Sequence, residues 1–257
     1  MEEFDKKIYN RRAMSSEKAS EVKREGHAAE SEFAKIIDGK IYSSGRKKDV
    51  VDKKGDLHSV KSGDQKWQIF LFGGARFQKE IDFQASDLLL ECIKCFPIKR
   101  EDYLKNKVIF KKRLSKKMNA LKKYLCSGRN KLIFFKKSFL NNGEVDYITV
   151  KEGRIFHVFD GEEVINLLDH ATEVVNSTAR RIDQFDNQKV VFKLKGAETL
   201  GEVEMRNDSD IHYRELKFWV SRPKMLSLLI ENIFPLKKCF NNRIFVYGKA
   251  TKKFKEL

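Results

Sequence analysis

The segment from Gly45 to Gly63, GRKKDVVDKKGDLHSVKSG, contains residue types that could hydrolyse a phosphodiester bond. Asp49 precedes a Lys-Lys-Gly-Asp sequence, and Lys61 follows it. A carboxylate can hold a divalent metal ion, which polarises a phosphate and activates a bound water. A lysine can orient that water or stabilise the charge that develops in the transition state. We therefore take Asp49 and Lys61 as the candidate catalytic pair.

Two short strands are expected to position this pair. The sequence predicts one strand from Asp49 to Asp52 and a returning strand from Leu57 to Ser62, joined by a turn over Lys53 to Asp56. If the strands pair across that turn, Asp49 and Lys61 lie at matching depths on the hairpin.

Side-chain alternation along the returning strand separates its polar residues. Ser59 and Lys61 fall on one face, and His58 falls on the other. His58 is therefore expected to have a structural role and not to act as a general base. Asp52 and Asp56 are expected to be turn residues.

The region from about residue 26 to 72 resembles the PD-(D/E)xK nuclease superfamily, in particular type II restriction endonucleases. The resemblance rests on a helix containing GHAAE, followed by K-D-V-V, a tight turn and S-V-K. Asp49 matches the first acidic position of the motif, and Lys61 matches its lysine. The resemblance implies that Asp49 binds magnesium and that Lys61 assists the nucleophile.

Two positions depart from the motif. Lys48 stands where the family has proline, and Ser59 stands where the second acidic ligand belongs. Some restriction enzymes with S-V-K are similar, and in them a helical glutamate supplies the missing acid. The resemblance makes Glu30 the first candidate, which gives Asp49, Lys61 and Glu30 as catalytic residues and Asp49 and Glu30 as magnesium ligands. Glu32 flanks the apolar face of the same helix equally well, and Glu80 is a downstream alternative.

The charge of the chain points to a polyanionic partner. Its 53 basic and 37 acidic residues give a net charge of +16 and an isoelectric point near 9.6. In the 39-residue window from Lys99 to Lys137, 15 basic residues face only two acidic ones. This block predicts a DNA-binding helix with a basic face and an apolar stripe. The DNA-binding candidates are Lys111, Lys112, Lys116 and Lys117. The expected stripe is Leu104, Val108, Met118, Leu121 and Leu125.

A second candidate contact region is the segment GEVEMRNDSDIHYRELKFWV, residues 201 to 220. It reads as two strands around a polar loop, in which Arg206, Asn207 and Arg214 are candidate base readers. Arginine pairs well with guanine and asparagine with adenine in the major groove. Glu202 and Glu204, on one face of the first strand, leave a metal site open as an alternative.

The predicted fold is a mixed α/β chain with a PD-(D/E)xK-like mixed sheet flanked by helices and a strand-rich C-terminal half. Residues 1–142 are expected to form the catalytic core with the basic helix, and residues 143–257 a DNA-recognition region. Helices are predicted over Ser16–Val22, from His27 to Ile37, over Ser86–Cys95, over the basic block and after Pro223. Strands are predicted at 40–43, 147–150, 154–158, 189–194, 202–206, 215–220 and 243–247.

The sequence is interpreted as that of a type II restriction endonuclease that cleaves double-stranded DNA with Mg²⁺. We expect a cytoplasmic protein, because the chain contains no run of about 18 apolar residues and its N-terminus lacks the apolar core of a signal peptide. A homodimer is implied only by analogy with the family. Two alternatives remain: a resolvase or repair nuclease of the same superfamily, and a non-catalytic nucleic-acid-binding protein that uses only the basic block.

Overall fold

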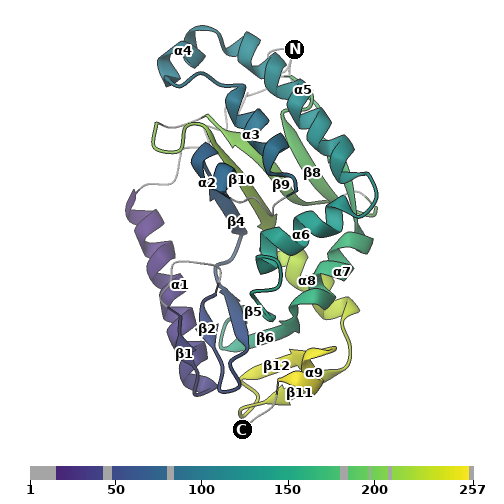
Figure 1. The fold of residues 1–257 in the computed structure, drawn as a ribbon. Coiled ribbons are helices and arrows are strands. Elements are labelled where there is room, and N and C mark those ends of the chain that lie inside the picture. Colours follow the sequence, from purple (N-terminus) through teal and green to yellow (C-terminus); the bar gives the residue numbers. More distant parts are fainter. Residues whose placement is uncertain are drawn as a thin grey trace, which may run out of the picture.

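The structure, a computed structural model, describes residues 16–42, 48–79, 84–179, 185–196, 198–207 and 210–254. It is a mixed α/β structure with two sheets and flanking helices (Figure 1). The helices are α1 Ser16–Ile36, α2 Gly74–Lys79, α3 Ser86–Lys94, α4 Arg100–Lys105, α5 Lys107–Leu125, α6 Asn130–Leu140, α7 Gly161–Ala171, α8 Arg222–Asn232 and α9 Ala250–Lys253. None of these described helices combines the length and the apolar character that a membrane span requires.

The first sheet contains the predicted catalytic hairpin. Its seven strands run in the order β1-β2-β3-β5-β6-β12-β11. β3 pairs in parallel with β5, and β6 pairs in parallel with β12, whereas the other neighbours are antiparallel. The strands are β1 Lys40–Ile41, β2 Val50–Val51, β3 Leu57–Lys61, β5 Tyr147–Glu152, β6 Ile155–Asp160, β11 Leu236–Cys239 and β12 Ile244–Tyr247.

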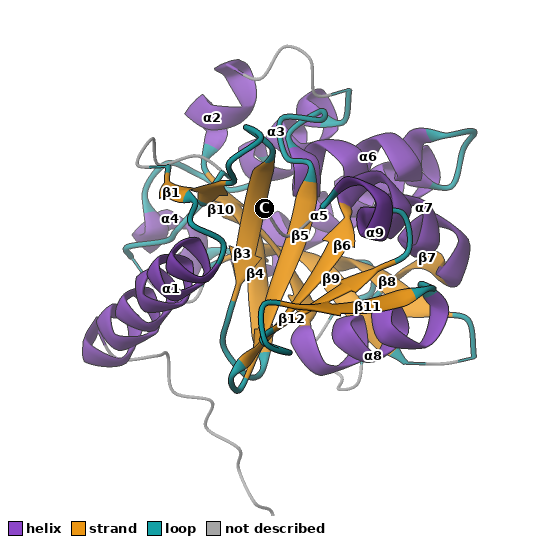
Figure 2. Ribbon diagram, turned by 90° about the horizontal axis from the view of Figure 1, so that it is seen from below, coloured by secondary structure: helices purple, strands orange, loops and turns teal. Residues whose placement is uncertain are grey.

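Helices cover both faces of this sheet (Figure 2). On one face, Phe33 of α1 and Phe254 pack with Val60 and Phe156 in a small core. On the other face, strand residues such as Val150 join a larger core with α6, α7 and α8. The hairpin lies near one edge of the sheet, beside α1 (Figures 1 and 2). Asp49, which precedes β2, therefore lies at the edge of the sheet that is beside α1.

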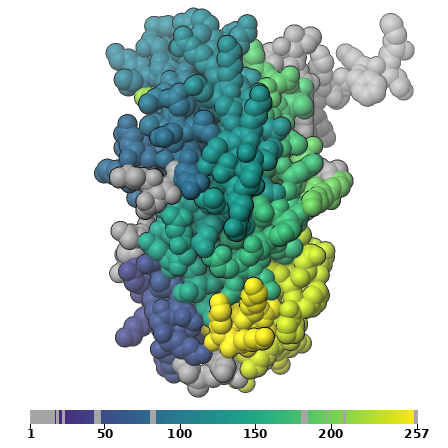
Figure 3. Space-filling view, turned by 45° about the vertical axis from the view of Figure 1, so that its right-hand side comes forward, coloured from purple at the N-terminus to yellow at the C-terminus, as the bar shows by residue number. Residues whose placement is uncertain are grey.

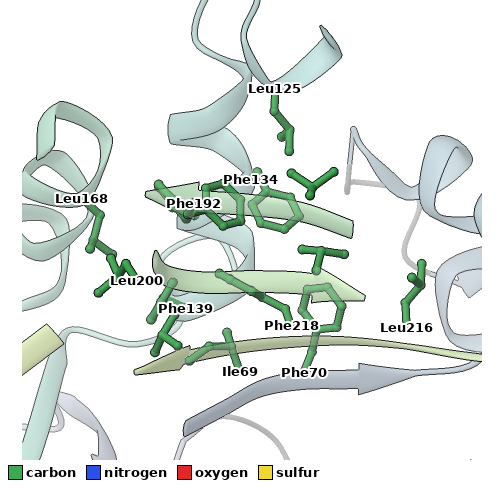
Figure 4. Packing of buried hydrophobic residues seen from close by; sticks show 14 of the residues in the cluster. Ile69, Phe70, Leu125, Phe134, Phe139, Leu168, Phe192, Leu200, Leu216 and Phe218 are labelled. Carbon is green, nitrogen blue, oxygen red and sulfur yellow. The ribbon is translucent and has the colours of Figure 1, made fainter. Parts of the chain in front are cut away.

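The second sheet has five antiparallel strands in the order β4-β10-β9-β8-β7. An aromatic layer fills the core on its helix-covered face. Figure 4 shows Phe134 of α6 among Phe70, Phe192 and Phe218 of the strands. The ring centroids of Phe134 and Phe218 are 5.4 Å apart, an ordinary distance for packed aromatic rings. The strands are β4 Lys66–Phe72, β7 Thr172–Asn176, β8 Lys189–Leu194, β9 Thr199–Arg206 and β10 Glu215–Ser221.

The expected division between residues 142 and 143 does not follow the sheets. β3 from the first part of the chain pairs with β5 from the second, and β4 pairs with β10. Both sheets therefore combine strands from each side of that boundary. The large core also joins α3, α5 and α6 to strands of both sheets.

The basic block, Lys99 to Lys137, spans α4, α5 and most of α6, where one long helix was expected. Asn106 separates α4 from α5, with backbone angles of φ −130° and ψ 39° that do not fit a helix. Met118, Leu121 and Leu125 are buried as predicted, but Leu104 and Val108 are exposed. Leu104 lies in α4, before the break at Asn106. Val108 lies in α5 but ten residues before Met118, about 280° of rotation away on a helical wheel, so neither residue joins the buried stripe.

Two further differences concern helices near the sheets. Residues predicted as two N-terminal helices form one continuous helix, α1, which passes through Gly26. α6 was not predicted as a separate helix, and α7 was not predicted, although α7 has a capping signal: the Asp160 carboxylate accepts a hydrogen bond from the Glu163 amide at 3.0 Å. The predicted hairpin of β5 and β6 is confirmed, as are strands at the positions of β8, β9, β10 and β12 and helix α8.

Candidate active site

The hairpin of β2 and β3 is held in register by its turn. Val50 pairs with His58, and Val51 pairs with Leu57. The Asp52 carboxylate accepts hydrogen bonds from the backbone amides of Lys54 at 2.8 Å and Asp56 at 3.0 Å. Asp52 is thus a turn residue, as predicted, and its turn fixes which residues of the two strands face one another.

Asp49 lies just before β2 and turns its carboxylate toward β3. Its Oδ2 accepts a hydrogen bond from the Val60 amide at 2.7 Å and one from the Ser59 hydroxyl at 3.3 Å. Lys61 Nζ lies 3.6 Å from the same oxygen. Oδ1 accepts no hydrogen bond from the described residues. The predicted pair is therefore brought together, and the hairpin holds one of the two carboxylate oxygens.

Ser59 connects the two candidate catalytic side chains. Lys61 Nζ donates a hydrogen bond to Ser59 Oγ at 2.6 Å, and Ser59 Oγ donates to Asp49 Oδ2. From the sequence, Ser59 was considered only as the motif position that lacks the second acid. The alternation that puts Ser59 and Lys61 on one face was the signal that could have identified this link.

The charge of Glu30 acts on the Asp49 carboxyl. Burial raises the pKa of the Asp49 carboxyl above its usual value of 3.8, while the charge of Lys61 lowers it and the charge of Glu30 raises it. Glu30 lies in α1, where His27 Nδ1 is 3.1 Å from its carboxylate. The helix thus brings a second carboxylate close enough to act on the first.

The other two candidate glutamates are not equivalent to Glu30. Glu32 is held by two cations from distant strands and loops: Lys151 Nζ at 2.6 Å and an Arg243 guanidinium nitrogen at 2.5 Å. Its charge is already compensated by these partners. Glu80 lies outside the described residues.

His58 is part of the core, as the alternation predicted. It is fully buried, its ring stacks on Tyr147 at 4.7 Å, and its Nδ1 is 2.9 Å from Thr149 Oγ1. Burial lowers the pKa of His58, so the ring is neutral at neutral pH. It points away from Lys61 and cannot serve as the base in this site.

Asp49 and Glu30 are the residues that could hold a magnesium ion, since both carry oxygen donors. Each has an oxygen that accepts no hydrogen bond from the described residues. The described part of the chain has no cluster of three or more Asp, Glu, His or Cys side chains placed so that they could hold a metal ion. Magnesium does not need such a cluster, because it is commonly held by one or two carboxylates together with water and substrate phosphates.

Glu202 and Glu204, the alternative metal ligands, are paired with a lysine. Lys189 Nζ lies 2.8 Å from the Glu202 carboxylate and 2.7 Å from the Glu204 carboxylate. The ammonium group satisfies both acids, and their charges in turn raise the pKa of Lys189 against the effect of burial. These three residues form an ion-pair network on the sheet surface.

The basic face of α5 lies apart from the hairpin. α5 packs on α3, β7 and β8, and in Figure 3 it runs down the middle of the visible face, with the purple N-terminal segment at the lower left. Lys112 and Lys116 are exposed, and Lys111 is half-buried. Lys117 forms an ion pair with Glu91 at 2.8 Å. Of the four predicted phosphate contacts, Lys117 is the one that has a compensating acid among the described residues.

The three candidate base readers lie around the tip of the β9–β10 hairpin. The Asn207 side chain donates a hydrogen bond to the Tyr103 hydroxyl at 2.9 Å, which ties the loop to α4. Arg214 has a left-handed backbone with φ 61° and lines a cavity of about 270 Å³ between α2 and α3. Arg206 ends β9 and is half-buried. The asparagine amide nitrogen is therefore engaged in anchoring this loop.

We expect Asp49→Asn to raise the melting temperature of the metal-free protein. Because the pKa of Asp49 is raised, its ionised form costs more in the folded than in the unfolded state. That cost is present above the folded pKa and disappears as pH falls through it. The difference in melting temperature, measured in EDTA from pH 4 to pH 8, should therefore shrink toward acid pH. Added Mg²⁺ should stabilise the wild type more than the variant.

Comparisons with protein-family models, with curated proteins and with solved structures return no match for this chain. The interpretation of the site therefore rests on its geometry and on the motif in the sequence.

Proposed function

We propose that the chain is a magnesium-dependent endonuclease that hydrolyses phosphodiester bonds in double-stranded DNA. The observation that carries this proposal is the network in which Lys61, Ser59 and Asp49 are joined, with Glu30 close enough to raise the pKa of Asp49. An ion pair that only stabilises the fold would not need a second carboxylate beside it. Two acids and one lysine at the edge of a sheet are what metal-assisted hydrolysis uses.

In the proposed mechanism, Asp49 and Glu30 hold Mg²⁺, which would polarise the scissile phosphate and activate a water. The Val60 amide and Ser59 hydroxyl fix the orientation of the Asp49 carboxylate. Ser59 also holds the Lys61 ammonium group near that carboxylate. Lys61 would orient the attacking water and stabilise the negative charge of the transition state.

The finer assignment is a type II restriction endonuclease with PD-(D/E)xK architecture. It is supported by the S-V-K strand, the preceding Asp49 and the helical acid, in the order in which the motif has them. We propose that two copies act together, because one site faces one strand and double-strand cleavage requires two. Arg206, Asn207 and Arg214 remain the proposed sequence readers.

The deciding experiment is incubation of supercoiled plasmid with the protein, in Mg²⁺ or in EDTA. Discrete fragments in Mg²⁺ alone would support a restriction enzyme, and a smear would support a nuclease of low specificity. DNA that is bound but intact under both conditions would contradict the proposal. That result would favour a non-catalytic binding protein.

The binding-protein alternative is supported by one observation: the basic face of α5 is separate from the hairpin. In the nuclease, the same face would contribute non-specific affinity. We expect Lys112→Gln combined with Lys116→Gln to weaken binding to all DNA sequences alike. The slope of log affinity against log salt should become shallower by up to about two, since each phosphate contact contributes about 0.9.

Lys117→Gln is the matched control, because it removes the same charge from the same helix at a residue already paired with Glu91. It should change the salt slope less than either single variant at the exposed positions. An unchanged slope in the Lys112 and Lys116 double variant would show that this face does not contact DNA.

A further inference from the structure

Two isoleucines project from the end of the molecule near α4. Ile98 is 82% exposed and Ile211 is 85% exposed, the highest values among the large apolar side chains of the described ranges. Ile98 lies between α3 and α4, and Ile211 lies in the loop between β9 and β10. Leaving these two apolar side chains in water is unfavourable, and the residues around them do not cover them.

The two loops that carry them are joined beneath the isoleucines. The Tyr213 hydroxyl donates a hydrogen bond to the Pro97 carbonyl at 3.0 Å. Arg100 and Asp210 form an ion pair at 3.0 Å, one or two residues from the isoleucines. The rings of Phe96 and Tyr213 stack with centroids 6.3 Å apart. The exposed side chains therefore stand on loops fixed by aromatic and polar contacts.

The charge around these side chains decides which partner they fit. Between Lys99 and Arg113 there are seven basic and two acidic residues, and between Arg206 and Glu215 there are two basic and three acidic residues, which together give a net charge of +4. A second copy would bring the same charge against itself, which disfavours an isologous contact. A polyanion would be attracted. DNA accepts apolar side chains such as isoleucine between neighbouring base pairs, at the cost of some base stacking.

We propose that Ile98 and Ile211 form a wedge that inserts between base pairs of double-stranded DNA and locally unwinds the duplex. This inference rests on the proposed function, because it takes DNA as the substrate. It adds a distortion of that substrate to the cleavage reaction.

The wedge and the catalytic hairpin lie at opposite ends of β4. β4 begins five residues after Lys61, and its last residue, Phe72, pairs with Leu216 near the tip loop. Seven residues at about 3.3 Å each span about 23 Å. That distance corresponds to six or seven base pairs at about 3.4 Å each. The wedge would therefore act on bases away from the cleaved bond, and its effect would be on the path of the DNA.

The wedge can be tested without cleavage. Relaxed closed-circular plasmid is incubated in EDTA with the protein and a topoisomerase that needs no metal, and its linking number is measured after protein removal. We expect the wild type to lower the linking number in proportion to bound protein. The double variant Ile98→Ser with Ile211→Ser should lose more than half of this change at equal occupancy. The control, Val108→Ser with Ile109→Ser, removes exposed apolar residues of α5 and should keep it.

Filter retention of the same plasmid separates the possible failures. Plasmid that is retained but not unwound would overturn the wedge and leave the endonuclease proposal intact. Plasmid that is not retained at all would overturn both. Self-association of the wild type that the isoleucine double variant abolishes, in sedimentation velocity, would show that the tip joins two copies and is not a wedge.

Discussion

Replacing Lys61 with alanine should lower the rate of DNA cleavage by about 10²- to 10³-fold, the loss typical of removing one group that stabilises transition-state charge. Lys61 Nζ is 3.6 Å from the Asp49 carboxylate and hydrogen-bonded to Ser59. Affinity for DNA should change little, because most of the positive charge lies elsewhere in the chain. Single-turnover cleavage and filter binding, measured on the same DNA, give both values.

The Lys61 variant should also shift the pH dependence of the remaining activity. Lys61 lowers the pKa of Asp49, so its removal raises that pKa further. Asp49 must be ionised to bind a metal ion, and the acid limb of the rate profile should therefore move to higher pH. A merely structural role of Lys61 would reduce the rate equally at every pH.

Lys54→Ala is the matched control for Lys61. Lys54 lies in the turn of the same hairpin, and its ammonium group donates to the Lys253 carbonyl, away from Asp49. Its removal takes one charge from the hairpin and should leave the cleavage rate within a small factor of wild type. Near wild-type cleavage by Lys61→Ala would remove Lys61 from the mechanism.

The hairpin could be predicted because its determinants are local. A Lys-Lys-Gly-Asp turn and alternating residues fix its register within 13 positions, from Asp49 to Lys61. For the same reason, the local sequence predicted that Asp49 lies beside Lys61. It also predicted that His58 lies in the core. The local sequence does not determine which other strands pair with this hairpin.

The helix α6 shows why other parts could not be predicted. Its sequence, NKLIFFKKSFL, buries Phe134, Phe135, Phe139 and Leu140 among both sheets and α7. A helix packed on several sides lacks the single apolar stripe that reveals an amphipathic helix. The exposure of Leu104 and Val108 has another origin, because Leu104 lies in α4, before the break at Asn106, and Val108 is on a different face of α5 from the buried stripe.

The choice between Glu30 and Glu32 illustrates the same limit within the site. On a helical wheel both flank the buried face, so periodicity does not distinguish them. The partners that distinguish them are distant in sequence: Lys151 is 119 residues from Glu32, and Arg243 is 211 residues from it. Only the folded chain brings these cations to Glu32 and leaves Glu30 to act on Asp49.

Replacing Glu30 with alanine should raise the Mg²⁺ concentration needed for half-maximal cleavage and lower the maximal rate. With Ser59 at the usual position of the second acid, Asp49 would be the only anionic ligand left. One carboxylate and a substrate phosphate can hold magnesium, but with weaker affinity and looser placement of the water. Glu30→Gln should behave similarly, because an amide keeps the shape and loses the charge. Titration of single-turnover rates with Mg²⁺ measures both effects.

Removal of Glu30 has a second expected consequence, opposite in sign to that of removing Lys61. The charge of Glu30 raises the pKa of Asp49, so Glu30→Gln should lower it. The acid limb of the rate profile at saturating Mg²⁺ should then move to lower pH. The two variants would thus shift the profile in opposite directions, a pattern that general loss of structure does not produce.

Glu32→Ala provides the matched control on the same helix. It removes ion pairs with Lys151 and Arg243 on a half-exposed surface, which should cost about 1 kcal/mol of stability or less. Its Mg²⁺ requirement should match that of the wild type. Adding Ser59→Asp to Glu30→Ala should restore part of the activity, because it returns a carboxylate to the hairpin beside Asp49. If Glu30→Ala cleaves like the wild type while Glu80→Ala is inactive, the second acid comes from downstream of the hairpin and Glu30 is not a ligand.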